Sequence, residues 1–550
     1  MSRYALSIIC LAILPTLAAV AAPKNMTVHG RAPVGAFGVD TVEHVEGAAK
    51  LGMTLLYSYS PDSARKQLDL NDPMGKAVAK HKMQVMYPLC GRFTQVRLAR
   101  EIKPTDATIP VVGERADSVI SFPKSGYLTI EGERIEYATR TADAFGGCRR
   151  GAGGTRAAPH GAGLLLCNSE ALRKELLAVK DAPALWGYWL VDDSRPREID
   201  SLREMSRIIR LIDRDAQGRP NGHIIVMGIG GSSAMANFDV GICDAIGVYP
   251  YPYHAGKLNA TTRNQMRFIM TRARSLQPGV GLIGIYQAFA HDESPQWKNM
   301  PTPEQVREDM LSFYDWGADG VMAFIYHWAG KNKGLDAVPA VRDVIGRTDQ
   351  DILAGKIKRT VPPVGKLEWL TILTGSEAKP SPGGKPAYDL DDPAKLASLV
   401  KGNPSRLSAE PAVEHSPQPV EGRSYPLKVS FPAWNQADPK SDRWPRAPFV
   451  AADLTTSDWS QVGALEQPIY NPGEKTIVVL ISLEDTAKGL WERSVEIPPR
   501  VPMLLRVPMD EARLSVDPGH IQRWLLWQAD SPVAVQFRLG TPMLAPARKK

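Results

Sequence analysis

Cysteine is scarce in this chain of 550 residues, which contains only five. One of them, Cys10, lies in an apolar stretch at the N-terminus, and the spacing of the other four matches no zinc-binding pattern. Four cysteines permit three disulfide connectivities. Proximity along the chain favours a pair between Cys148 and Cys167, and ordinary buried thiols are the alternative.

Long apolar runs and clusters of charge are also missing. After the N-terminal segment no run approaches the roughly 20 apolar residues that a membrane span requires, so we expect none. The formal net charge is +7, but Lys and Arg are scattered apart from a short basic end at 548–550. A nucleic-acid-binding face needs basic residues gathered among aromatic ones, so we expect no nucleic-acid partner. Mild basicity suits an acidic polymer substrate and is also common among exported proteins.

The N-terminus has the pattern of a secretory signal. Arg3 supplies the positive charge, residues 5–17 the apolar core, and Ala19-Val20-Ala21 a small-residue cleavage site. We therefore expect a signal peptide over residues 1–21 and a secreted or periplasmic mature protein. Cys10 has no lipoprotein pattern before it, which favours free release over a lipid anchor.

From residue 35 to about 355, short β-like stretches alternate with amphipathic helical stretches, which is typical of parallel strands joined by crossover helices. Eight strands are expected, at residues 35–40, 53–60, 84–90, 185–193, 223–231, 245–254, 281–290 and 319–329. No glycine-rich phosphate loop follows the first strand, which disfavours an open dinucleotide-binding sheet. The sequence predicts an α/β fold, a (β/α)8 TIM barrel over residues 22–360.

One interval, after the third strand, is too long for a simple crossover. Residues 106–168 have strand and turn character of their own, with a hairpin expected around Glu131-Gly132, so we predict a small inserted β-module. The segment 122–163 pairs FPKSGYLTIEGERIEY with RGAGGTRAAPHGAG. It resembles a short β-module found in phage tail and surface proteins, which implies attachment or substrate contact and no chemistry.

The composition changes after the barrel. Residues 361–424 are rich in Pro, Gly, Ser and charge and are expected to form a linker. Residues 425–545 contain short alternating runs separated by Pro and Gly, which predict a C-terminal all-β sandwich.

Carboxylates at strand ends are the candidate catalytic groups. The aromatic run LWGYWLVDD at residues 185–193 ends in Asp192 and Asp193, and barrels of this type keep their chemistry at the C-terminal ends of the strands. Glycoside hydrolysis needs two carboxyl groups, a proton donor and a nucleophile or base. Asp193 is expected as the acid with Asp192 as its neighbour, although one of the pair could instead cap the next helix or pair with Arg195. The second carboxylate is sought among Asp40, Asp244, Asp292 and Glu293.

Aromatic and polar residues near the strand ends are expected to bind substrate, because rings stack on sugar faces and polar groups bind hydroxyls. The candidates are Tyr57, Tyr249, Tyr251, His254, Gln287, Tyr326, His327 and Trp328. The alternative is that several of these rings only plug the end of the barrel. His254, His291 and His327 with Asp40 or Asp193 would be a conceivable metal set. Hydroxyl binding explains them equally well, so no metal or cofactor is expected.

Three motifs in order resemble the clan A glycoside hydrolases. They are WLVDDSRP at the fourth strand, DAIGVYPYP from Asp244 to Pro252, and YQAF from Tyr286 to Phe289. The resemblance implies a carbohydrate-hydrolysing barrel. Two departures weaken this implication. Asp193 stands where the family has the Glu that donates the proton. Gln287 stands near the place of the family's nucleophilic Glu. Gln287 would then orient a substrate N-acetyl or hydroxyl group, or the site would bind glycans without cleaving them.

The C-terminal region resembles the carbohydrate-binding-like sandwiches appended to agarase-type hydrolases. The carrying segments are LKVSF at 427–431, Trp444-Pro445, Asp458-Trp459, Tyr470-Asn471-Pro472 and VEIPP at 495–499. Trp434, Trp459 and Trp491 are candidates for stacking on sugar, with a place in the core as the alternative.

The sequence therefore predicts a secreted or periplasmic glycoside hydrolase with a polysaccharide or oligosaccharide substrate. The alternative is a non-catalytic glycan-binding or cell-envelope polysaccharide-associated protein with a degenerate barrel site. A lyase or deacetylase would need a catalytic tyrosine or a metal triad. A serine nucleophile is disfavoured because no G-x-S-x-G turn is present. The pattern indicates no oligomeric state.

Overall fold

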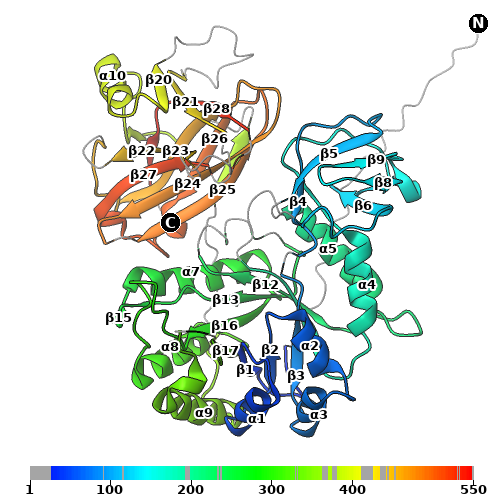
Figure 1. Cartoon of the computed structure of the whole chain (residues 1–550). Coiled ribbons are helices and arrows are strands. Elements are labelled where there is room, and N and C mark those ends of the chain that lie inside the picture. The colour runs from blue at the N-terminus through cyan, green and yellow to red at the C-terminus, as the bar shows by residue number, and fades with distance from the viewer. Residues whose placement is uncertain are drawn as a thin grey trace, which may run out of the picture.

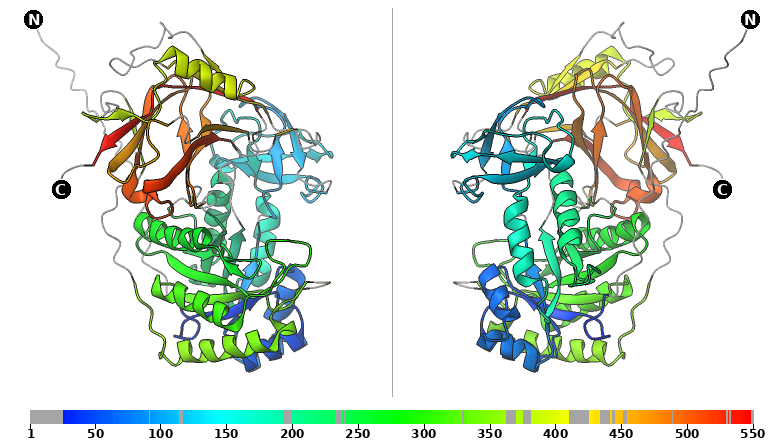
Figure 2. Two further views of the ribbon diagram at one scale, coloured as in Figure 1. Left: turned by 90° about the vertical axis from the view of Figure 1, so that its left-hand side faces the viewer. Right: turned by 90° about the vertical axis from the view of Figure 1, so that its right-hand side faces the viewer.

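The computed structural model describes residues 26–547, except 91, 114–116, 193–198, 232–234, 236–237, 239, 329, 331, 362–369, 375–380, 410–424, 434–440, 443–444, 451–453, 488, 529–530 and 532. The expected signal peptide and Asp193 lie outside the described residues. Figure 1 shows a barrel with two β-rich regions on one side of it, and both views in Figure 2 agree on that placement.

Eight parallel strands close into a barrel in the order β1-β17-β16-β13-β12-β11-β3-β2, which confirms the predicted barrel (Figure 1). All eight predicted strands form it. Their bounds are β1 Val34–Phe37, β2 Leu55–Tyr57, β3 Gln84–Pro88, β11 Leu185–Val191, β12 Ile224–Ile229, β13 Ala245–Val248, β16 Gly281–Gln287 and β17 Gly320–Phe324.

The barrel strands are separated by helices whose starts are encoded locally. Thr302 and Gln305 form a capping box at the start of α8, with Pro303 at its first position. Thr41 and Asn259 cap α1 and α7 in the simpler way, by accepting a backbone N–H. The helices are α1 Val42–Lys50, α2 Pro61–Leu68, α3 Pro73–Lys80, α4 Ser169–Val179, α5 Ile199–Ile212, α7 Ala260–Leu276, α8 Pro303–Asp315 and α9 Pro339–Leu353.

Between β3 and α4 the chain forms a separate small β region. The predicted hairpin is confirmed, because β6 (Gly126–Ile130) and β7 (Glu133–Tyr137) pair around Glu131 and Gly132, which both have positive φ. A five-stranded sheet has the order β10-β4-β5-β9-β8. Its strands are β4 Val96–Leu98, β5 Thr108–Gly113, β8 Thr139–Arg140, β9 Ala144–Gly146 and β10 Leu165–Leu166.

Two antiparallel sheets form the C-terminal β region. One sheet has the order β18-β26-β23-β28-β21-β20, joined by β29 and β19, and the other has the order β22-β27-β24-β25. The bounds are β18 Thr371–Thr374, β19 Lys385–Pro386, β20 Leu407–Ala409, β21 Leu427–Phe431, β22 Arg446–Val450, β23 Val462–Tyr470, β24 Ile477–Asp485, β25 Leu490–Ile497, β26 Met503–Pro508, β27 Ile521–Trp527, β28 Val535–Leu539 and β29 Met543–Pro546, with the helices α10 Pro393–Gly402 and α11 Met509–Ala512.

The C-terminal β region is tied to the barrel through a buried carboxylate. Glu511 on α11 is wholly buried and lies 3.2 Å from Nη1 of Arg272 on α7 and 2.9 Å from Nη1 of Arg493 on β25. Its second oxygen accepts the backbone N–H of Leu370. A buried carboxylate that lost these donors would be costly, so this contact fixes the two parts relative to one another.

The four described cysteines are free thiols. Cys148 and Cys167 are both free, as are Cys90 and Cys243, so the favoured disulfide is not formed.

Among the described helices, none combines the length and the apolar character needed to cross a bilayer.

The interior of the barrel is filled around one ring. Trp189 on β11 is wholly buried, and two glycines make room for it. A Cβ added at Gly228 on β12 or at Gly247 on β13 would lie 2.6 Å from the indole atoms of Trp189. Such a separation is far inside van der Waals contact, so the indole occupies the barrel axis because these two positions carry no side chain.

Candidate active site at the C-terminal end of the barrel

A continuous network of aromatic rings covers the C-terminal ends of the barrel strands. The ring of Phe37 on β1 lies 4.5 Å from Tyr57 and 5.3 Å from Trp189, and Phe324 on β17 links Tyr59, Tyr251 and Trp328 at centroid distances of 5.5 to 6.2 Å. The end aromatic network consists of Phe37, Tyr57, Tyr59, Trp189, Tyr249, Tyr251, Phe289, Trp297, Phe324 and Trp328.

Exposure increases from the barrel axis to the rim of this network. Tyr57 and Trp189 are wholly buried, whereas Tyr251, Trp297 and Trp328 are half-buried and Tyr59 is 42% exposed. The inner rings therefore plug the end of the barrel, which was the alternative to a role in substrate binding. Only the outer rings present a face to a ligand, and such faces suit the apolar side of a sugar ring.

Asp192 follows β11 and is held over the barrel axis. The indole Nε1–H of Trp189 donates a 2.7 Å hydrogen bond to Oδ1 of Asp192. A Cβ added at Gly228 would meet that same carboxylate oxygen at 3.0 Å and the ring of Tyr249 at 3.1 Å. The carboxylate of Asp192 thus lies beside Trp189 and Tyr249, at the inner edge of the end aromatic network, and its side chain is exposed.

The thiol of Cys90 and the hydroxyl of Tyr57 contact each other within the electrostatic influence of this carboxylate, and neither is reactive. Tyr57 Oη and Cys90 Sγ are 2.7 Å apart. Burial, and then the negative charge of Asp192, raises the pKa of Cys90 to about 12. Burial likewise raises the pKa of the Tyr57 hydroxyl well above its ordinary value. Neither group ionises near neutral pH, so neither is suited to serve as a nucleophile or as a lyase base.

Two other expected carboxylates lie at the same end of the barrel. Asp40 follows β1 and accepts a hydrogen bond from the hydroxyl of Ser58, which follows β2. Glu293 is exposed in the turn after β16. Asp244, by contrast, is turned away, because it accepts the backbone N–H of Ile225 at the start of β12 and pairs with Arg210 at 3.1 Å.

Gln287 and Tyr326, both expected to bind substrate, are buried. Gln287 is wholly buried at the end of β16, and its Oε1 accepts the backbone N–H of Tyr253 at 3.3 Å. The Tyr326 side chain is 4% exposed and points toward α1, since a Cβ added at Gly47 would lie 1.9 Å from its hydroxyl. Both residues therefore support the structure around the site.

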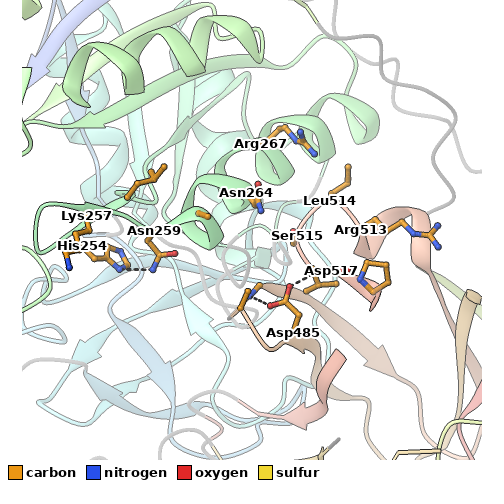
Figure 3. A pocket seen from close by; sticks show the side chains of 16 residues that line it. His254, Lys257, Asn259, Asn264, Arg267, Asp485, Arg513, Leu514, Ser515 and Asp517 are labelled. Carbon is orange, nitrogen blue, oxygen red and sulfur yellow. Dashed lines mark hydrogen bonds between the residues drawn. The ribbon is translucent and has the colours of Figure 1, made fainter. Parts of the chain in front are cut away.

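His254 lies in a separate cleft between the barrel and the C-terminal β region. Figure 3 shows His254, Asn259 and Arg267 on the barrel side of this cleft, with Asp485 and Asp517 on the other. Its volume is about 670 Å³. Both ring nitrogens of His254 have amide neighbours, with Nδ1 2.9 Å from Nδ2 of Asn259 and Nε2 2.9 Å from Nε2 of Gln296.

Two tryptophans expected to stack on sugar are core residues of the C-terminal β region. Trp459 and Trp491 are both wholly buried, so neither offers a face to a ligand. The third candidate, Trp434, lies outside the described residues.

His327 completes a group that no sequence motif marked. Its Nδ1 lies 2.7 Å from Oδ2 of Asp336, and its ring lies 4.7 Å from that of His44 on α1. His44 and Asp336 are the members that sequence reasoning missed, because neither belongs to a short motif and the chain brings them together only by closing β1 against β17.

Comparisons with known proteins give only distant structural likenesses. No protein-family model and no curated protein matches the sequence. A pyruvate kinase from Cryptosporidium parvum is similar in structure with 13% identity and a TM-score of 0.31, over 60% of this chain and 71% of that one. A β-galactosidase from the psychrophilic Marinomonas ef1 has 12% identity and a TM-score of 0.36, over 58% and 59%. A family 11 carbohydrate-binding module from Clostridium thermocellum has 12% identity and a TM-score of 0.20, over 33% and 91%. Scores this low carry no conclusion about function.

Proposed function

We propose that the protein is a secreted or periplasmic glycoside hydrolase that binds a polysaccharide at the C-terminal end of its barrel. The observation that carries the proposal is the position of Asp192, an exposed carboxylate fixed by Trp189 beside a network of aromatic rings. Aromatic faces and carboxylates at the C-terminal ends of barrel strands are the groups that carbohydrate chemistry uses. The pattern of a secretory signal at residues 1–21 supports the proposed location.

Asp192 is assigned the nucleophile or base role in this proposal. An N–H donor stabilises the ionised form of a carboxyl group and disfavours its protonated form. A carboxyl group that accepts the Trp189 N–H is therefore better suited to attack carbon or activate water than to donate a proton. The proton donor is then sought among Asp40 and Glu293, which come after β1 and β16 at the same end of the barrel, and Asp193, which follows Asp192 in the sequence.

A second candidate function is glycan binding without cleavage. It is favoured by Gln287, which brings a buried amide rather than a carboxylate to the end of β16. Because an amide cannot act as a carboxylate nucleophile, hydrolysis would depend on a second carboxylate from another part of the barrel.

The experiment that separates the two functions measures reducing-end release and gel retardation on one panel of bacterial and plant polysaccharides. The purified mature protein is compared with Asp192→Asn, Asp193→Asn, Asp40→Asn and Glu293→Gln, and with Asp181→Asn as an exposed control carboxylate. Hydrolysis predicts release by the parent and by the control, with loss in Asp192→Asn and in one further variant. Retardation of the parent with no release of reducing ends would favour the binding function. Neither release nor retardation on any polymer would contradict both.

A further inference from the structure

Two histidines and an aspartate meet at the rim of the barrel, between the first and last barrel strands. His44 lies in the first turn of α1, which follows β1, whereas His327 and Asp336 follow β17. Each residue can offer one ligand atom such that the three atoms lie within 4.8 Å of one another. We propose that this cluster of His44, His327 and Asp336 binds a divalent transition-metal ion such as Zn²⁺.

The donor set is one that such ions prefer. Zn²⁺ is bound by imidazole nitrogen and carboxylate oxygen at about 2.0 to 2.2 Å in tetrahedral sites, so ligand atoms come to lie a little over 3 Å apart. The ligand atoms of the two imidazoles and the carboxylate, which all lie within 4.8 Å of one another, are close to that spacing. A set of hard oxygen ligands would have suited Mg²⁺ or Ca²⁺ instead.

The backbone that carries two of the proposed ligands, His327 and Asp336, is closely packed. The backbone N–H of Asp336 donates to the carbonyl of Tyr326 at 2.9 Å. A Cβ added at Gly334 would lie 3.0 Å from the Cα of His327, and one at Gly38 would lie 2.8 Å from its carbonyl oxygen. The backbone at His327 is thus closely approached by Gly334 and Gly38, and that at Asp336 is hydrogen-bonded to Tyr326, which fixes the positions from which the two potential ligands extend.

The hydrogen-bond contacts of the two imidazole rings are compatible with metal binding. Nδ1 of His327 lies 2.7 Å from Oδ2 of Asp336, so the imidazole and the carboxylate of the proposed cluster already face each other. His44 Nδ1 now accepts the backbone N–H of Asp40 at 3.3 Å. This long hydrogen bond would be given up on binding.

The site has room for a further ligand. The side chains of His327 and Asp336 are 41% and 30% exposed. Water can therefore complete a tetrahedral shell, as in metal sites that keep an open position. The consequence for the fold is a link between α1 and the segment after β17, which also carries Trp328 of the end aromatic network.

The test uses tag-free mature protein, stripped of metal by a chelator and titrated with Co²⁺ and Zn²⁺. The proposal predicts one equivalent of Co²⁺ bound with the visible absorption of a tetrahedral site, its displacement by Zn²⁺, and a rise in melting temperature. His44→Gln and His327→Gln are expected to lose about 100-fold or more in affinity and Asp336→Asn about 10- to 100-fold, with His254→Gln unchanged. Melting curves without metal identify any variant that fails to fold.

Absence of saturable Co²⁺ binding by the parent would overturn the proposal. So would affinity that is unchanged in folded His44→Gln and His327→Gln. The readout is independent of carbohydrate, so a failure of the proposed hydrolase function would leave this result standing, and the reverse also holds.

Discussion

The Nε1–H of Trp189 donates a hydrogen bond to Oδ1 of Asp192, so the ring that fills the barrel axis also fixes the carboxylate above it. Core packing and the candidate catalytic group are therefore coupled through one side chain. Gly228 lies close to both side chains, since an added Cβ there would meet the indole at 2.6 Å and the carboxylate at 3.0 Å.

Trp189→Phe is predicted to lower turnover of the polysaccharide substrate by about 10- to 100-fold, because a carboxylate that loses its N–H donor is no longer held in one position. Initial rates with purified variants measure this. Trp186→Phe is the matched control, since Trp186 also faces the barrel interior on β11 but its N–H donates to the carbonyl of Thr27. Equal losses in the two variants would show that packing, and not the hydrogen bond to Asp192, sets the rate.

Gly228→Ala is predicted to destabilise the protein by about 1 to 3 kcal/mol or more, because the added methyl group overlaps the rigid indole of Trp189. Chemical denaturation measures the free energy of unfolding. Gly402→Ala is the control, since a Cβ there meets no atom within 4 Å. If Gly228→Ala proved as stable as this control, the tight fit around Trp189 would be wrong.

Asp309→Asn is predicted to stabilise the protein near neutral pH. Asp309 on α8 is buried, and burial raises its pKa from 3.8 to about 7. Between these two values the unfolded chain releases a proton that the folded chain retains, so this residue lowers stability by about 1.4 kcal/mol for each pH unit gained. The gain in Asp309→Asn should therefore grow from near zero below pH 4 to a few kcal/mol at pH 7.

Urea denaturation at pH 4 and pH 7 measures this difference. Asp315→Asn, an exposed carboxylate on the same helix, serves as the control and should change little at either pH. A gain in Asp309→Asn that is equal at both pH values would rule out ionisation as its cause.

Glu133 supports the small β region between β3 and α4 through a buried ionic network. Burial alone would raise its pKa, but hydrogen bonds from Arg150, His160 and the backbone amides of Ala158 and Gly151 outweigh burial and lower it to about 2. This stabilisation is present above the ordinary pKa of 4.5 and is lost as the pH falls toward 2.

Glu133→Gln is predicted to cost about 3 to 5 kcal/mol, because it leaves the buried guanidinium of Arg150 without its counter-charge. Hydrogen exchange in residues 126–137 should accelerate, which mass spectrometry measures. Glu136→Gln removes only a surface ion pair with Arg149, so it should cost at most about 1 kcal/mol. Similar protection in the two variants would contradict the role of the buried network.

The barrel could be predicted because each strand is a short apolar run bounded by turn residues and separated by an amphipathic helix. The hairpin at Glu131 and Gly132 was equally clear from its turn residues. Side-chain direction at the strand ends was less accessible, because it depends on local register. The register of β11 against β12 shifts between Trp189 and Val191, and alternation along the sequence does not reveal such a shift.

The burial of Gln287, Tyr57 and Tyr326 could not be predicted for the same reason, because it too depends on side-chain direction at the strand ends. Each stands at or just after the end of a strand, as a ligand-binding residue would, but each is wholly or almost wholly buried. Contacts between residues far apart in the sequence could not be predicted either. His44 and Asp336, for example, meet only because β17 lies beside β1 in the closed barrel.

The most direct test of the proposed hydrolase compares initial rates of reducing-end release by the parent and by Asp192→Asn on the polysaccharide that the parent degrades fastest. We predict a fall of at least about 1,000-fold with the melting temperature unchanged, as for loss of a group that acts on the reacting atoms. A folded Asp192→Asn variant with the rate of the parent would contradict the assignment of Asp192 and the active site built around it.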